Sequence, residues 1–255
     1  MRPLSLTPHG PSLGGATPLV CVPIVAADAS EALHQAQQIC THQPAPDVVE
    51  LRADALPPPS IVGIPQLLQQ LHTILGDIPI LFTHRRVEEG GLGRWAEDER
   101  IASILSAIHS GHVALADIEL ATATPLRERI ITASKAAEIG IVVSAHDFTA
   151  TPDDAALAAI FAALIASGGD AAKYAATPTT PADALRLLRV TAQVATVAAI
   201  PLISMAMGAA GTITRLAGPF FGSALTFATI GATSAPGQMP IALVRDYWRH
   251  AGLRD

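Results

Sequence analysis

A lysine in an apolar segment is the first sign of chemistry in this sequence. Of its 16 basic residues, only Lys135 and Lys173 are lysines. Lys173 lies among small apolar residues at 170–175, a predicted strand, whereas Lys135 lies in a predicted helix and is expected on the surface. Arginine stays protonated, but a buried lysine readily loses its proton and becomes a nucleophile. We therefore expect Lys173 to attack a carbonyl carbon, with a solvent-reaching lysine at a strand end as the alternative.

His146 closes the preceding apolar segment, at 142–146. Adjacent parallel strands lie about 4.8 Å apart, so a histidine and a lysine near the ends of neighbouring strands can face one reacting carbon. An imidazole takes up and returns a proton near neutral pH. The pair Lys173 and His146 thus predicts a nucleophile with a general acid/base beside it.

Charged residues also follow two earlier apolar segments. Glu50, Arg52 and Asp54 alternate with period two, which places them on one face of a strand. Arg85 follows the next segment, and Glu89 comes shortly after it at a glycine turn. Buried charges are costly unless they are paired, so these residues form either a structural ion network or part of a substrate site.

Three further charges interrupt apolar sequence. Asp117 and Glu119 share a strand face, and either one could orient His146. Arg215 is the only Lys, Arg, Asp or Glu between positions 189 and 245. A guanidinium in such surroundings needs an anionic partner, and a substrate carboxylate held in a bidentate manner would serve. The alternative is a surface arginine on a helix.

The elements that must position these side chains alternate along the chain. Short apolar or β-branched runs recur roughly every 30 residues, the length of a βα unit. The expected strands are 19–26, 47–52, 79–83, 114–120, 140–146, 170–174, 201–205 and 224–229. The expected helices include 30–40, 95–109, 126–139, 152–166 and 181–197. This α/β alternation predicts a single (β/α)8 TIM barrel, with catalytic groups at the carboxyl ends of the strands. The rival, a doubly wound open sheet, usually carries a glycine-rich turn after its first strand, which is missing here.

No linker divides the chain, so residues 1–255 are expected to form one catalytic domain. Residues 1–17 are an N-terminal extension rich in proline and glycine; they form either a hairpin that closes the barrel bottom or a partly mobile segment. A polar turn at 234–238 follows the last expected strand and suits a loop that closes over the site.

Composition excludes several classes of protein. Apolar residues make up 50% of the chain and charged residues 15%, which is typical of a folded domain. The formal charge of −6 argues against binding to nucleic acid or an anionic membrane. Cys21 and Cys40 belong to no CxxC or Cys/His cluster, so neither a disulfide nor a metal is indicated, and a reducing, cytoplasmic compartment is expected. The apolar stretch 190–214 is interrupted by Gln193, Pro201 and two glycines, so it does not predict a membrane helix.

Eight motifs follow one another between Val20 and Gln238. They are ELR at 50–52, FTHR at 82–85 with EGG at 89–91, SAHDF at 144–148, DAAK at 170–173, SMAMG at 204–208, TRLAG at 214–218, FGS at 221–223 and SAPGQ at 234–238. In this order they resemble the type I 3-dehydroquinate dehydratase (3-dehydroquinase) family. Pro23 and Thr214 depart mildly from the family pattern, and neither change touches the lysine or the histidine.

The resemblance implies a (β/α)8 lyase of the shikimate pathway of aromatic amino acid biosynthesis. Such an enzyme is usually a homodimer without metal or cofactor, and its substrate is 3-dehydroquinate. Lys173 then matches the Schiff-base lysine, His146 the general acid/base, and Glu89 an acidic residue near the reacting centre. The matching substrate-binding positions are Glu50, Arg52, Arg85, Arg215, Ser234 and Gln238.

Two other functions stay open on the residues alone. A class I aldolase on the same barrel would also use a strand lysine as a Schiff base, although the arginine-rich site and His146 favour dehydration. A catalytically silent barrel that only binds quinate-like ligands is the other, and the intact Lys173 and His146 argue against it.

Overall fold

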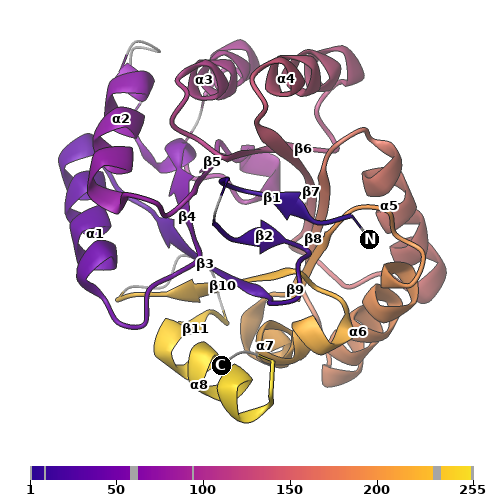
Figure 1. The fold of residues 1–255 in the computed structure, drawn as a ribbon. Helices are drawn as coiled ribbons and strands as arrows, with labels where there is room; N and C mark the ends of the chain where they lie inside the picture. The colour runs from indigo at the N-terminus through magenta and orange to yellow at the C-terminus, as the bar shows by residue number, and fades with distance from the viewer. Residues whose placement is uncertain (1, 9, 58–62, 94, 232–236, 254–255) are drawn as a thin grey trace.

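A closed barrel of eight parallel strands forms the centre of the protein (Figure 1). The computed structural model describes residues 2–8, 10–57, 63–93, 95–231 and 237–253. The strands are β3 (Leu19–Ile24), β4 (Val48–Arg52), β5 (Ile80–Thr83), β6 (Leu115–Glu119), β7 (Gly140–Asp147), β8 (Ala171–Ala176), β9 (Leu202–Ala206) and β10 (Leu225–Thr229). Each strand from β3 to β9 pairs in parallel with the next, β10 pairs with β3, and an isolated parallel bridge between Leu202 and Ser223 lies at the seam between β9 and β10. At this seam beside β9, the backbone N–H of Ala224 donates to the carbonyl of Leu202 at 2.7 Å. The predicted barrel and its eight strands are confirmed.

Helices surround the barrel, as Figure 1 shows. They are α1 (Ala29–Thr41), α2 (Gly63–Leu75), α3 (Glu97–His109), α4 (Thr124–Ala136), α5 (Asp154–Ala166), α6 (Pro181–Ala195), α7 (Gly208–Ala217) and α8 (Ile241–His250). Short 3-10 turns and a short strand lie between these elements: η1 (Ala53–Ala55), η2 (Val87–Glu89), η3 (Gly218–Phe221) and β11 (Met239–Pro240). The sequence predicted α1, α3, α4, α5 and α6 but not α2, α7 or α8. Two glycines and three β-branched residues weaken the helix signal of α7.

The alternation of side chains along the strands creates two separate cores. On β8, Ala172 and Tyr174 point outward and pack in the layer between strands and helices. Ala171 and Ala175 point inward and join the apolar cluster inside the barrel. Because successive strand residues face opposite sides, Lys173 also points into the barrel.

The N-terminal extension forms a hairpin, one of the two alternatives that the sequence left open. Strands β1 (Leu4–Ser5) and β2 (Ser12–Leu13) pair antiparallel and lie across the centre of the ring of strands in Figure 1. Leu6 and Leu13 are buried in the same interior cluster as Leu19 and Leu115, the first residues of β3 and β6. The hairpin therefore closes the barrel at the amino ends of its strands, opposite the end where catalytic groups are expected.

Among the described residues, no helix combines the length and apolar character that crossing a membrane requires. This agrees with the interpretation of 190–214 from the sequence, where α6 ends at Ala195 and β9 and α7 follow as separate elements.

The floor formed by the hairpin predicts a stability effect. Leu13 is fully buried, so Leu13→Ala should lower the free energy of unfolding by about 3 kcal/mol, the usual cost of a cavity in a packed core. Urea denaturation measures this. The control is Leu185→Ala, since Leu185 is 61% exposed and its loss should change stability by no more than about 0.5 kcal/mol. Equal stability of Leu13→Ala and the wild type would show that the hairpin does not seal the core.

Candidate active site

The amine of Lys173 lies inside the barrel, surrounded by carboxylates and one aromatic ring. The residue is only 4% exposed. Its Nζ atom lies 3.1 Å from Oδ2 of Asp117 on β6 and 4.0 Å from Oε1 of Glu50 on β4. The ring centroid of Phe227 on β10 lies 4.8 Å from the same nitrogen. The structure thus excludes the alternative of a lysine that extends to solvent.

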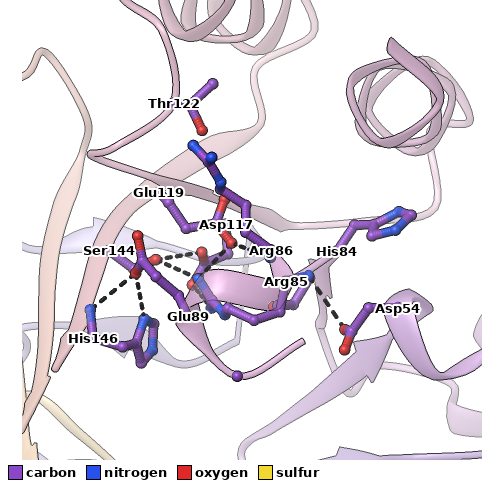
Figure 2. A network of polar contacts seen from close by, with 12 residues as sticks. Asp54, His84, Arg85, Arg86, Glu89, Asp117, Glu119, Thr122, Ser144 and His146 are labelled. Carbon is purple, nitrogen blue, oxygen red and sulfur yellow. Dashed lines mark hydrogen bonds and ion pairs between the residues drawn. The ribbon is translucent and has the colours of Figure 1, made fainter. Parts of the chain in front are cut away.

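His146 faces the same space from the neighbouring strand. In the register of β7 with β8, Ser144 pairs with Lys173 and His146 with Ala175, so His146 lies one inward step nearer the carboxyl ends. Its Nδ1 atom is 3.0 Å from Oε2 of Glu89, and its backbone N–H donates to the same oxygen at 2.9 Å. Figure 2 shows Glu89 reaching the histidine from η2. When Glu89 is ionised its carboxylate can only accept, so in that state Nδ1 carries the proton and Nε2 is left to take one up.

This geometry corrects one prediction. The sequence suggested that Asp117 or Glu119 orients His146, and that assignment is wrong. Both carboxylates point inward from β6, but Arg85 engages them, and Glu89 reaches the histidine instead because η2 folds back over the strand ends.

The surroundings shift the proton equilibria of this pair in opposite directions. Burial, with the nearby charge of Glu119 adding to it, raises the pKa of Glu89 to about 7. Burial, together with the positive charges of Arg85 and Lys173, lowers the pKa of His146 well below its usual value. At neutral pH the imidazole is therefore uncharged, which is the form of a general base.

Arg85 connects the carboxylates of β6 with β7. Its guanidinium lies 2.8 Å from Asp117 and 3.0 Å from Glu119, and it donates to Oγ of Ser144 at 2.7 Å. Burial acts to raise the pKa of Asp117, but Arg85 and Lys173 outweigh it and hold the pKa far below its ordinary value. Asp117 is therefore ionised beside the amine. The sequence gave it no role there, although its inward position on a strand adjacent to His146 was a usable signal.

Glu50 and Arg52 lie on the other side of Lys173. Oγ1 of Thr83 donates to Glu50 at 2.7 Å, and Arg52 makes two hydrogen bonds, of 2.9 and 2.8 Å, to Asp54. Asp54 belongs to η1 rather than to the strand, so the period-two prediction stops at Arg52. The predicted ion network exists, and both Glu50 and Arg52 also line the cavity.

Arg215 reaches the cavity from α7, which begins directly after β9. It is 2% exposed, and burial lowers its pKa to about 10. One of its guanidinium nitrogens lies 3.6 Å from the sulfur of Met205. The alternative of a surface arginine is therefore wrong. Gln238 also lines the cavity, whereas the predicted binding residue Ser234 lies outside the described residues.

The cavity combines charged and apolar walls. It is lined by Glu50, Arg52, Arg85, Glu89, Gly90, His146, Phe148, Lys173, Ala175, Met205, Met207, Arg215, Phe227 and Gln238. The apolar residues of this lining had no predicted role. Met205 and Phe227 sit at inward positions of their strands, so the alternation of side chains could have identified them.

This arrangement suits covalent chemistry on a small polar molecule with a carboxylate. An enclosed amine can form an imine with a ketone, an uncharged imidazole beside it can move a proton, and an arginine can hold a carboxylate. Within the described ranges, no three His, Cys, Asp or Glu side chains are grouped so that they could hold a metal ion.

Known proteins share both the sequence and the fold. A family model described as type I 3-dehydroquinase matches residues 20–254. The 3-dehydroquinate dehydratase of Geobacillus kaustophilus is 41% identical over 240 residues, 91% of this chain and 90% of that protein. The crystal structure of 3-dehydroquinate dehydratase from the same organism superimposes with a TM-score of 0.91 at 37% identity, covering 98% of each chain. That of type I 3-dehydroquinate dehydratase from Clostridium difficile with covalent modified comenic acid gives 0.92 at 28% identity, again over 98% of each chain. The chain therefore belongs to the type I 3-dehydroquinase family.

Proposed function

We propose that this protein dehydrates 3-dehydroquinate to 3-dehydroshikimate, a step of the shikimate pathway, through an imine formed on Lys173. The observation that carries the proposal is that the Lys173 amine and the His146 imidazole, on adjacent strands, line one cavity together with the buried Arg215. The membership of the chain in the type I 3-dehydroquinase family supports the same reaction.

The chemistry begins when Nζ of Lys173 attacks the ring ketone. The carbonyl oxygen leaves as water, and the carbon–nitrogen bond becomes a protonated imine. This cation withdraws electrons, so the adjacent C–H bond becomes acidic, and His146 removes its proton to give an enamine. The electron pair then returns and expels the neighbouring hydroxyl, to which His146 delivers the proton. Hydrolysis of the imine consumes one water, so one water is lost overall and the lysine is regenerated.

The remaining residues orient the groups that react. Arg215 binds the carboxylate, because a bidentate guanidinium fits its planar geometry. Glu50, Arg85 and Gln238 hold ring oxygens, with Arg52 and Ser234 completing the substrate contacts. Glu89 holds the imidazole through Nδ1 and so leaves Nε2 for the proton transfer.

We further propose that residues 1–255 act as one catalytic domain, in a cytoplasmic homodimer. The protonated imine formed on Lys173 is the electron sink of the reaction, so it requires neither a metal nor a cofactor. The net charge of −6 supports the absence of a nucleic-acid partner.

Borohydride trapping tests the nucleophile. Reduction in the presence of 3-dehydroquinate should add a stable ligand mass to Lys173, because only an imine is converted to a secondary amine. Peptide mass mapping locates the adduct. Lys135, exposed on α4, is the internal control and should stay unmodified. An adduct confined to Lys135 would refute the assignment, and retro-aldol products in place of a growing enone absorbance would favour the aldolase.

Replacement of the base separates the two chemical steps. His146→Ala should still form the trapped imine on Lys173, since the amine remains, but should lose turnover by about 10²-fold or more because no group removes the proton. Single-turnover trapping and steady-state rates measure the two effects. Near-normal turnover in His146→Ala would remove the residue from this role.

The raised pKa of Glu89 predicts the pH dependence. Below about pH 7 the carboxyl is protonated and no longer stabilises the Nδ1–H of His146 as an anion, so kcat/KM should rise between pH 6 and 8 with a midpoint near 7. Glu89→Gln should abolish that midpoint. Glu88→Gln, which removes the neighbouring carboxylate whose side chain is 72% exposed, is the control and should keep it. Persistence of the midpoint in Glu89→Gln would assign it to another group.

A further inference from the structure

A buried arginine behind the active site has no role in the reaction described so far. Arg100 lies in the first turns of α3, is 3% exposed and does not line the active-site cavity. Its side chain points toward the barrel rather than to solvent and makes one hydrogen bond for each of its five N–H groups. Such complete use of a guanidinium fixes both its position and that of its partners.

The partners of Arg100 lead to the reacting amine. One nitrogen donates to Oε2 of Glu119 at 2.7 Å, and the other carboxylate oxygen of Glu119 accepts from the Arg85 guanidinium at 3.0 Å. Arg85 lies 2.8 Å from Asp117, and Asp117 lies 3.1 Å from Nζ of Lys173. Positive and negative groups therefore alternate along one line from α3 to the amine.

Arg100 and Glu119 also hold the backbone that carries Arg85. Arg100 donates to the carbonyl of His84 at 3.3 Å, and Glu119 accepts from the backbone N–H of Arg86 at 3.0 Å. Figure 2 shows Glu119 beside this segment and Asp54 on its other side. Asp54 accepts from the backbone N–H of Arg85 at 3.2 Å. The backbone at residues 84–86 is thus held by Asp54 on one side and by Glu119 and Arg100 on the other. The contacts of Arg100 with Glu119 and with the His84 carbonyl fix the second side.

We propose that Arg100 is a positioning residue for the dehydration, which acts through Glu119 to keep Arg85 on Asp117 and so limits the negative charge that acts on Lys173. The inference rests on the proposed function. Without Arg100, Arg85 is the side-chain cation that stays on the buried Glu119 among the described residues, and Glu119 draws it away from Asp117. The freed charge of Asp117 then holds the Lys173 amine more tightly, at 3.1 Å, and opposes its attack on a ketone.

The groups that face this line belong to several elements. Glu97, Thr122, Arg85 and the carbonyl of His84 surround Arg100 and Glu119. Around the Lys173 amine lie Glu50 on β4 and Asp117 on β6. His146 and Cys21 lie near enough for the charge of Lys173 to act on them. Because Glu50 stays in place, weaker pairing of Asp117 with Arg85 changes the charge around the amine in one direction only, toward more negative.

Steady-state kinetics over pH 6–10 on the full-length protein test this. Arg100→Met should lower kcat at pH 7 by about 10-fold or more, and the deficit should shrink toward pH 10, because the stronger hold of Asp117 acts on the protonated amine. The control is Arg245→Met. Arg245 forms a buried ion pair with Asp47 at 2.8 Å, and neither residue lines the cavity. It should lower thermal stability but leave the pH profile unchanged.

A double variant tests the route. Arg100→Met combined with Glu119→Gln removes the uncompensated charge and should recover a large part of the lost kcat. Wild-type kcat in Arg100→Met, a pH-independent deficit equal to that of Arg245→Met, or no recovery in the double variant would each overturn the proposal. If Arg100→Met does not fold, Arg100→Lys, which keeps the charge but not the five bonds, must show the same pH-dependent deficit at smaller size. A borohydride adduct on Lys173 in every variant keeps failure of this inference distinct from failure of the proposed function.

Discussion

The pairing of Asp117 with both Arg85 and Lys173 is the interaction on which the site depends. An ionised carboxylate with almost no exposure to water is stable only if cations neutralise it, and Asp117 has two of them, at 2.8 and 3.1 Å. The same contacts bring a lysine amine, an arginine and a carboxylate to one level of the barrel interior. The charge of each group therefore depends on its neighbours, and a change in one pair is transmitted to the others.

The barrel makes this pairing possible through its register. Strands β5, β6, β7 and β8 follow one another around the wall, and their inward residues meet near the carboxyl ends. Ser144 pairs with Lys173 in the strand register and accepts a hydrogen bond from Arg85, so this neutral side chain lies beside both charged ones. His146 lies one inward step higher, close enough to share the cavity but held by Glu89 from η2 rather than by the interior carboxylates.

The two ends of the barrel have different physical roles. At the amino ends, Leu6 and Leu13 of the hairpin complete an apolar floor. At the carboxyl ends, apolar side chains such as Met205 and Phe227 form walls around charged groups and exclude water from them. This low-dielectric surrounding raises the pKa of Glu89 and lowers that of His146, and electrostatic interactions inside it are stronger than at the surface.

The sequence alone determined the barrel, its eight strands and most of the charged residues that line the cavity, because strand periodicity and the rarity of lysine are local signals. Lys173, His146, Glu50, Arg52, Arg85, Arg215 and Gln238 all line the predicted cavity. Only the tertiary structure decided which charge pairs with which: Glu89 rather than Asp117 reaches His146, and Arg100 on α3 reaches Glu119 on β6. Such pairings depend on how far side chains extend between elements distant in the chain. Local periodicity fixes the face on which a residue lies, but not the partner that it meets there.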